Sequence, residues 1–195
     1  MQSSARHAQY LKMDSSAKRD RLRDIIVEKS YRFRPEGFKL ASGRISQFFF
    51  NLKPTMLDPE GINLLADLLI EDLRKEGIRC IGGPVMGAVP LVDALSVKSF
   101  GVFELATFFV RKEAKDHGVK QKIDGTLLDN SEVAVIDDVV TTGGSVQIAV
   151  DAARERGCTV NRAWVVIDRE EGAAERLQEQ GIGLRSLFKR SDFAT

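Results

Sequence analysis

The sequence lacks several features that mark large classes of protein. It has no apolar run of membrane-spanning length, and its polar N-terminus does not have the pattern of a signal peptide. A dominant charge is also missing, because 29 basic and 28 acidic residues are interspersed and leave a formal net charge of +1. We therefore expect no membrane association and no dedicated nucleic-acid surface, which would require a concentrated basic face.

Cysteine is scarce, and no repeat or low-complexity segment is present. Cys80 and Cys158 stand alone and do not have the spacing of a metal site. Isolated cysteines most often behave as small buried hydrophobic residues in a reducing compartment. The 195 residues are enough for one domain with its own core. We expect a single domain over residues 1–195, located in the cytoplasm.

The most informative segment is residues 133–145, which reads VAVIDDVVTTGGS. Glu132–Ile136 is a mostly apolar, β-branched run, typical of a strand buried on both faces of a parallel sheet. Asp137 and Asp138 stand at its carboxyl end, and Thr141–Ser145 places hydroxyls and glycines in one turn. Apolar residues at helical spacing follow and predict a helix that ends at Gly157.

Each part of this unit has a chemical interpretation. Backbone amides of a glycine-rich turn at a helix N-terminus bind a phosphate monoester, and Thr and Ser hydroxyls add hydrogen bonds. The carboxylates would repel a phosphate, so we expect them to face sugar hydroxyls or a positive charge that develops in a transition state. The lysine of a nucleotide-hydrolase loop is absent, which excludes that motif. The alternative is a strand that ends in two aspartates before an ordinary turn.

The rest of the chain alternates strands with helices, which predicts a doubly wound, mostly parallel sheet with helices on both faces. A small N-terminal β-hairpin is expected over residues 38–51, and a polar loop over residues 111–125. Other strands are expected at residues 79–81, 105–110, 162–167 and 183–188. Helices are expected after a cap at Asp14, Ser15 or Ser16, and at residues 59–73, 88–99 and 173–180. Ligands of such sheets bind beyond the carboxyl ends of the strands, where the loops after Ile81, Val110, Ile136 and Ile167 converge.

Residues 135–145 resemble the phosphoribosyl diphosphate signature of the type I phosphoribosyltransferases, which has an apolar strand, two acids, two apolar residues and a Thr/Gly/Ser loop. The resemblance implies that this segment binds phosphoribosyl diphosphate, and that the two aspartates are catalytic. The implied contacts are Asp137, Asp138, Val139, Val140, Thr141, Thr142, Gly143, Gly144 and Ser145.

The charged octapeptide Arg111–Gly118 follows the strand predicted to end at Val110, so it begins at the same edge of the sheet as the loop Thr141–Ser145. A cationic loop there could close over a polyanion and stabilise a departing diphosphate; the alternative is a solvated surface loop. It resembles the flexible catalytic loop of the orotate phosphoribosyltransferases. The resemblance implies a homodimer in which loop 111–118 acts in the partner's site, Lys115 and His117 being catalytic. The implied diphosphate contacts are Arg111, Lys112, Lys115 and His117.

Three further segments resemble the same family. Leu40–Arg44 and Phe48–Asn51 resemble its base-covering hood, where Phe49 and Phe50 would contact orotate, although three phenylalanines could equally pack a core. Arg169 matches the arginine that holds the orotate carboxylate, which a guanidinium binds with two bonds, and Thr141 would orient the same ligand. Alone, the segment around Arg169 would be an ordinary helix start. Gly83–Gly87 resembles the diphosphate loop.

Two positions depart from some members of that family, which have Lys where this chain has Ala41 and Tyr-Lys where it has Met86-Gly87. Lys39, two residues from Ala41, is expected to substitute in part for the first of these lysines. Residues 1–13 are polar and without periodicity, and their role is not indicated.

The resemblance as a whole implies transfer of the 5-phosphoribosyl group to orotate, giving orotidine 5′-monophosphate and diphosphate in de novo pyrimidine biosynthesis. It implies Mg²⁺ that is carried by the substrate, with no direct protein ligand and with water between the ion and Asp137 and Asp138. The alternatives are a purine or uracil phosphoribosyltransferase, and a non-catalytic regulator that binds phosphoribosyl diphosphate and RNA. The cationic loop and the balanced charge disfavour them.

Overall fold

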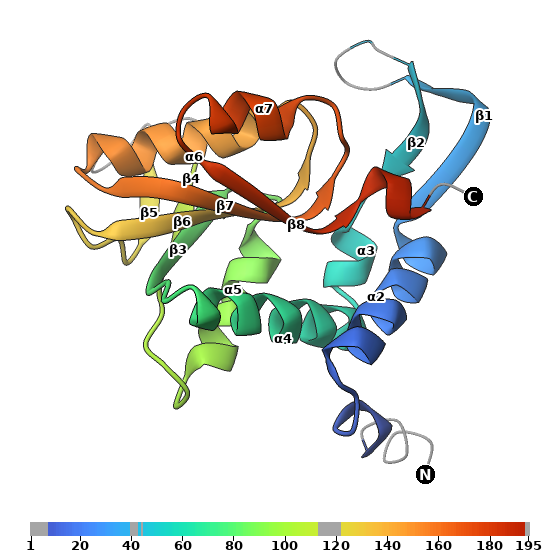
Figure 1. Ribbon diagram of the computed structural model, residues 1–195, viewed down its shortest axis with the longest axis horizontal. Helices are drawn as coiled ribbons and strands as arrows, with labels where there is room; N and C mark the ends of the chain where they lie inside the picture. Colours follow the sequence, from blue (N-terminus) through green and yellow to red (C-terminus); the bar gives the residue numbers. More distant parts are fainter. Residues whose placement is uncertain (1–7, 40–42, 44, 113–121, 194–195) are drawn as a thin grey trace. The chain divides into compact units, whose positions relative to one another are not determined.

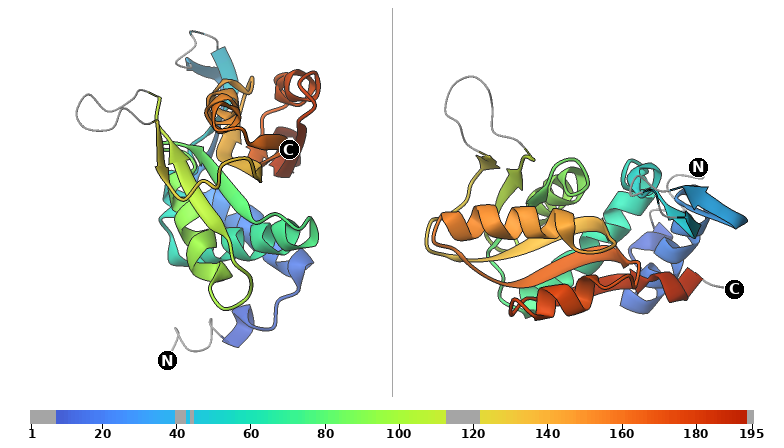
Figure 2. Two further views of the ribbon diagram at one scale, coloured as in Figure 1. Left: turned by 90° about the vertical axis from the view of Figure 1, so that its left-hand side faces the viewer. Right: turned by 90° about the horizontal axis from the view of Figure 1, so that it is seen from above.

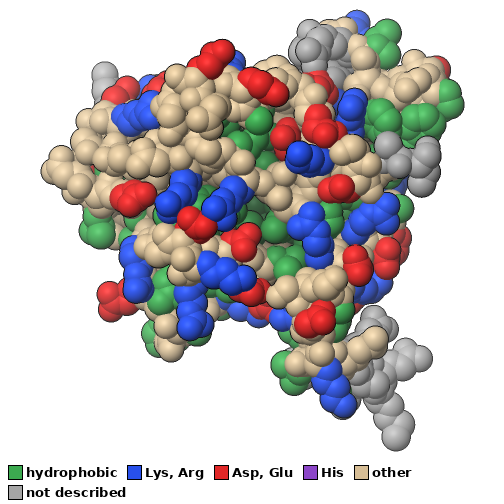
Figure 3. All heavy atoms as spheres, in the orientation of Figure 1, with side chains coloured by type: hydrophobic (Ala, Val, Ile, Leu, Met, Phe, Trp, Pro, Cys, Tyr) green, Lys and Arg blue, Asp and Glu red, His purple; other side chains and the backbone are tan. Residues whose placement is uncertain are grey.

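The computed structural model describes residues 8–39, 43, 45–112 and 122–193. The chain divides into two compact units, Met1–Leu68 and Leu69–Thr195. Figure 1 shows the elements of both, and acidic and basic side chains are interspersed on the face drawn in Figure 3. Within the described ranges, every helix is too short or too polar to cross a bilayer.

The first unit combines short helices with a β-hairpin. Helix α2 (Ser15–Lys29) begins at Asp14, whose carboxylate accepts a hydrogen bond from the Ala17 N–H at 2.8 Å, as a helix cap should. Its buried residues are Leu22, Ile25 and Ile26, which lie at helical spacing. The other elements are β1 (Tyr31–Lys39), β2 (Ile45–Phe50), α3 (Lys53–Met56) and the first part of α4 (Pro59–Lys75).

The hairpin is confirmed, but it begins at Tyr31 and not at Phe38. Strand β1 contains several charged residues as well as Pro35 and Gly37, which interrupt the alternation of apolar and polar residues that indicates a strand. Its register with β2 shifts between Phe33 and Phe38. Cross-strand aromatic contacts hold the pairing, since the ring of Tyr31 lies 5.2 Å from that of Phe50 and the ring of Phe33 lies 5.4 Å from that of Phe48.

The second unit is built on a six-stranded sheet with the order β5-β4-β3-β6-β7-β8, in which β5 pairs with β4 in the antiparallel sense and all other pairs are parallel. Helices α6 and α7 cover one face and α5 covers the other (Figures 1 and 2), which confirms the doubly wound prediction. The strands are β3 (Cys80–Pro84), β4 (Ala106–Val110), β5 (Ile123–Gly125), β6 (Glu132–Val140), β7 (Thr159–Asp168) and β8 (Gly183–Lys189); the helices are α5 (Val89–Ser99), α6 (Gly144–Glu155), α7 (Ala173–Gln178) and the 3-10 helix η1 (Arg190–Phe193).

Several strands extend beyond their predicted ends. Strand β6 continues through both aspartates to Val140, because β7 pairs with it along nearly its whole length. Residues 123–125 lie in β5, although the whole of 111–125 was predicted to be a loop. A strand of three residues is too short to produce a detectable periodicity.

Strands β3 and β6 approach each other closely. A Cβ atom added to Gly83 would lie 1.9 Å from the carbonyl oxygen of Ile136, so only glycine fits there. In the seam between β3 and β6, the paired residues are Ile81 with Ala134 and Gly82 with Val135. The carboxyl ends of the two central strands therefore lie against each other.

Candidate active site

The direction of strand addition reverses between β3 and β6. Strand β4 follows β3 on one side, whereas β6, β7 and β8 continue on the other. In open α/β sheets this reversal leaves a crevice beyond the strand carboxyl ends, which is where ligands bind. The turn after β3 and the end of β6 meet at this edge, where Gly87 lies against Asp137 and Asp138.

Asp137 and Asp138 form a hydrogen-bonded pair at the end of β6. Asp137 is only 3% exposed, whereas Asp138 is half-buried. The Ser145 hydroxyl donates to Oδ2 of Asp137 at 2.7 Å, and the Asp138 N–H donates to its Oδ1 at 2.9 Å. The Val139 N–H donates to Oδ1 of Asp138 at 2.8 Å. Both carboxylates are thus fixed in orientation before any ligand arrives.

Burial raises the pKa of Asp137 to about 7, and the neighbouring charge of Asp138 acts in the same direction. The hydrogen bond from Ser145 opposes this shift, because it stabilises the ionised form. A carboxyl group that titrates near neutrality at the end of a strand is typical of a catalytic position.

The turn after β3 lies directly against this acidic pair. A Cβ atom on Gly87 would lie 2.5 Å from Oδ1 of Asp138 and 2.6 Å from Oδ1 of Asp137. A side chain at this position, such as the lysine that some family members have, would require the two carboxylates or the turn to shift. Here the backbone of Gly87 lies against the carboxylates, and the neighbouring Met86 side chain is exposed. Nothing in the local sequence indicated this contact.

The loop between β6 and α6 has the predicted conformation. Gly143 adopts a left-handed backbone with φ of 83° at the N-cap of α6, a conformation that favours glycine. Its carbonyl accepts a hydrogen bond from Gln147 N–H at 2.9 Å, which begins the helix. Thr141 is half-buried and Thr142 is exposed. The hydroxyl of Ser145 contacts Asp137, a partner that the sequence did not indicate.

Arg169 lies at the carboxyl end of β7, close to the start of the same loop. Its backbone N–H donates to the carbonyl of Val140 at 3.0 Å, so it is bonded to the residue that precedes Thr141. The guanidinium is buried, with 6% of the residue exposed, and Nη2 forms a 2.7 Å ion pair with Glu171. The structure thus brings Arg169 and Thr141 to one edge of the sheet.

The predicted cationic loop is described only in part. Arg111 pairs with Asp124 of β5, and its N–H donates to the carbonyl of Lys122 at 2.8 Å. Lys112 is exposed. Lys115 and His117 lie outside the described residues, as does Ala41.

The two aromatic residues predicted to cover a base belong to the first unit. Phe49 is 39% exposed and its ring lies 5.4 Å from that of Phe38. Phe50 is buried, on the opposite face of β2, next to Tyr31. The two rings therefore cannot cover the same face of a flat ligand.

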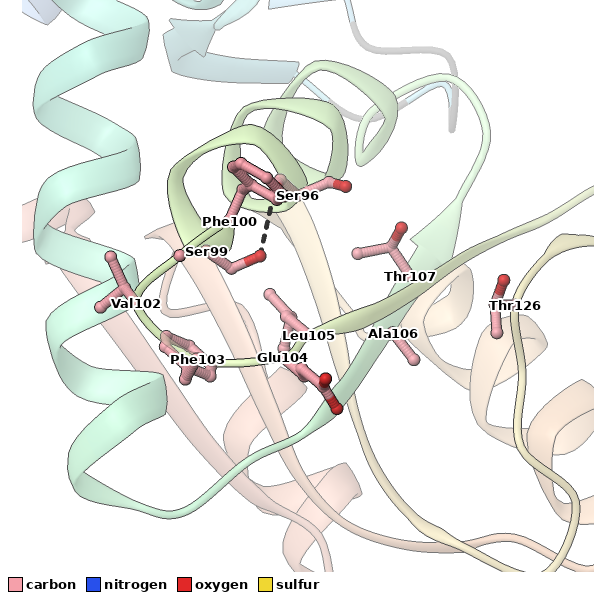
Figure 4. Close-up of a pocket in the computed structure, with 11 residues that line it drawn as sticks. Ser96, Ser99, Phe100, Val102, Phe103, Glu104, Leu105, Ala106, Thr107 and Thr126 are labelled. Carbon is pink, nitrogen blue, oxygen red and sulfur yellow. Dashed lines mark hydrogen bonds between the residues drawn. The ribbon is translucent and has the colours of Figure 1, made fainter.

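A separate hollow of about 720 Å³ lies at the amino end of β4, away from the carboxyl edge (Figure 4). Ser96 and Phe100 from the end of α5, Leu105 and Thr107 near the start of β4, and Thr126 contribute to its lining. Across the described part of the chain, no three His, Cys, Asp or Glu side chains gather to form a metal site.

Comparison with known proteins identifies relatives of this chain. Residues 56–180 match the phosphoribosyl transferase domain. An orotate phosphoribosyltransferase of Rhodopseudomonas palustris is 49% identical over 186 residues, which cover 93% of this chain and 98% of the relative. The crystal structure of Mycobacterium tuberculosis orotate phosphoribosyltransferase with Fe(III) dicitrate superposes with a TM-score of 0.78 and 29% identity, covering 91% of this chain and 99% of that one. Another structure of the same enzyme, in complex with 5-phospho-α-D-ribosyl 1-diphosphate, has a TM-score of 0.73 and 27% identity, covering 90% and 98%.

Proposed function

The chain belongs to the phosphoribosyl transferase domain family and, within it, to the orotate phosphoribosyltransferases, and we infer its reaction from that membership. It transfers the 5-phosphoribosyl group from 5-phosphoribosyl 1-diphosphate to orotate, and the products are orotidine 5′-monophosphate and diphosphate. This is a step of de novo pyrimidine biosynthesis. The observation that carries the assignment to this site is the oriented acidic pair beside a glycine-rich helix start at the reversal point of the sheet.

We propose that Thr141–Ser145 binds the 5-phosphate. The left-handed residue Gly143 begins α6, and the first N–H groups of a helix have no carbonyl partner within it, which suits an anion. Thr141 and Thr142 have hydroxyls that can add hydrogen bonds. The related enzyme bound to 5-phospho-α-D-ribosyl 1-diphosphate supports this ligand.

Asp137 and Asp138 would hold the ribose hydroxyls and oppose the positive charge that builds at the anomeric carbon. Both carboxylates are held in place by hydrogen bonds, so little reorganisation is needed when that charge develops. Since the pKa of Asp137 is raised to about 7, its contribution as an anion should decrease as the pH falls below neutrality.

Arg169 and Thr141 would orient orotate so that its ring nitrogen faces the anomeric carbon. The guanidinium already binds one carboxylate, that of Glu171, and orotate would have to share or replace this partner. A buried arginine bound to a carboxylate would discriminate against uracil, which has no such group. Of the two aromatic residues, the exposed Phe49 is the better candidate for contact with the base.

Mg²⁺ would enter with the substrate. Proteins usually provide only one or two carboxylates for Mg²⁺, because the ion retains several water molecules and binds substrate phosphates. Asp137 and Asp138 would reach it through water, and the ion would supply charge neutralisation at the diphosphate.

The active unit would be a homodimer in which loop 111–118 acts in the partner's site. Arg111, Lys112, Lys115 and His117 would neutralise the leaving diphosphate. Refolding a mixture of Lys115→Ala and Arg169→Ala, each of which should have little turnover of orotate on its own, tests the exchange. Random pairing makes half of the dimers mixed, each with one complete site, so about a quarter of wild-type activity should return. A loop that serves its own subunit would restore none.

The reaction itself is tested by assaying the purified protein with 5-phosphoribosyl 1-diphosphate, Mg²⁺ and orotate, uracil, adenine or hypoxanthine. Turnover should be confined to orotate. Efficient use of uracil or a purine would favour the alternative transferases, and binding of phosphoribosyl diphosphate without turnover of any base would favour a regulator.

A cytoplasmic location is proposed as well, supported by the two free cysteines, Cys80 and Cys158, both buried.

A further inference from the structure

Helix α7 packs against the outer side of the proposed phosphate loop. A Cβ atom on Gly143 would lie 3.7 Å from Cγ of Leu177 and 3.8 Å from Ala173, so the backbone of Gly143 contacts the buried side of α7. The side chain of Gln180, just after α7, donates to that of Gln147 on α6 at 2.6 Å. Helix α7 therefore contacts both the proposed phosphate loop and α6, the helix that follows that loop.

Arg176 extends from the exposed side of α7 toward this loop. Its Nη1 donates to the carbonyl oxygen of Thr142 at 3.4 Å. That carbonyl and the N–H of Gly143 belong to one planar peptide unit, so a bond to the oxygen restrains the direction of the N–H. A cationic donor on the carbonyl also polarises the peptide, which strengthens the N–H as a donor.

The loop has a shortage of positive charge that Arg176 can reduce. Residues 141–145 contain no lysine or arginine, and two carboxylates precede them by a few residues. A phosphate monoester carries between about one and a half and two negative charges at neutral pH. Neutral amides and hydroxyls would have to bind it beside Asp137, whose ionised form repels it. A guanidinium on the far side of the Thr142–Gly143 peptide offsets part of this repulsion.

We propose that Arg176 is a positioning residue for the 5-phosphate, which holds the Thr142–Gly143 peptide with its N–H toward the phosphate and supplies the cation that the loop lacks. This rests on the proposed function, because it assumes that Thr141–Ser145 binds the phosphate monoester. Arg176 acts through the loop and not by direct contact with the substrate.

The test compares two ligands of the same enzyme. Ribose 5-phosphate has the phosphate monoester but no diphosphate, and inorganic diphosphate has the reverse. In Arg176→Gln, the inhibition constant of ribose 5-phosphate and the KM for 5-phosphoribosyl 1-diphosphate should rise about threefold to fivefold, the upper part of the range for an exposed charge contact. The inhibition constant of diphosphate and the KM for orotate should stay within experimental error. Arg176→Lys, which keeps the charge, should recover most of the lost affinity.

Arg154→Gln is the matched control, because Arg154 also donates to backbone carbonyls, those of Val160 at 3.1 Å and Gln180 at 3.3 Å, from helix α6. An equal loss of ribose 5-phosphate binding in this variant would overturn the proposal, as would an unchanged inhibition constant in Arg176→Gln or an equal rise for both ligands. If wild-type protein fails to use orotate, the proposed function fails first. Active wild-type protein with an unaffected Arg176 variant refutes the positioning role alone.

Discussion

Replacing Asp137 by Asn should abolish turnover and at the same time stabilise the second unit above neutral pH. The carboxyl group of Asp137 is buried, and its pKa is raised from 3.8 to about 7. A raised pKa means that the protonated form stabilises the folded state fully below about pH 4, and that this contribution is lost as the pH rises through 7. Asparagine has nearly the same shape and never ionises, so the Asp137→Asn variant does not lose this stability as the pH rises.

The size of the effect follows from the shift. Three pKa units correspond to about 4 kcal/mol at pH 8. Asp137 ionises at a lower pH in the unfolded chain than in the folded protein, so somewhat less than half of this contribution of about 4 kcal/mol is already lost at pH 5. The stability difference between Asp137→Asn and wild type should therefore grow by about 2–3 kcal/mol from pH 5 to pH 8. For a chain of this length, that is a relative gain of about 4–12 °C in Tm.

The assay can follow the second unit directly. The chain has one tryptophan, and Trp164 is buried on β7, where it pairs in register with Ile136, the residue before Asp137. Its fluorescence during thermal unfolding reports on this sheet, and turnover of orotate is measured on the same samples. Asp151→Asn makes the same chemical change on an exposed position of α6 and should follow wild type at every pH. Parallel loss of stability in Asp137→Asn and wild type between pH 5 and pH 8 would refute the reasoning.

Three further substitutions test neighbouring contacts. Ser145→Ala removes the hydrogen bond that favours ionised Asp137, so the acid limb of the kcat/KM profile should move to higher pH, and Ser145→Thr should restore it; an unmoved limb in Ser145→Ala would mean that Asp137 does not control it. Gly87→Ala places a methyl group against both carboxylates and should reduce kcat by at least tenfold while Trp164 fluorescence reports a folded sheet; normal turnover would show that the turn moves freely. Arg169→Ala should reduce the preference for orotate over uracil, measured as the ratio of kcat/KM values, and an unchanged ratio would assign the carboxylate to another residue.

The parts of this protein that could be predicted from sequence are those in which neighbouring residues cooperate. The strand–acid pair–loop–helix unit around Asp137 is continuous in the chain, so β-branched residues, glycines and the helical pattern all indicate it locally. The alternation of strands and helices likewise predicted the parallel sheet and its ligand edge. The extension of β6 to Val140 was missed, because pairing with β7 overrides the polarity of two aspartates.

The contacts that complete the site arise between distant segments. Gly87 meets the carboxylates only after β3 and β6 have paired, and Arg176 reaches Thr142 only after α7 has packed on the loop. Neither contact has a local pattern, since a glycine after a strand and an arginine on a short helix are both common. The raised pKa of Asp137 depends on burial by the folded sheet and could not be read from the Asp-Asp pair.

The short seam between β3 and β6 has a consequence for motion. Registered pairing is limited to two positions there, whereas β6 and β7 are joined along most of their length. We expect the amides that bond β3 to β6 to exchange with deuterium faster than those that bond β6 to β7, because fewer bonds must open. The proposed substrate site lies across the end of this seam, between the turn at Gly87 and the loop at Gly143. A bound ribose phosphate would therefore act as a cross-link between the two halves of the sheet, and its release would require that they part slightly.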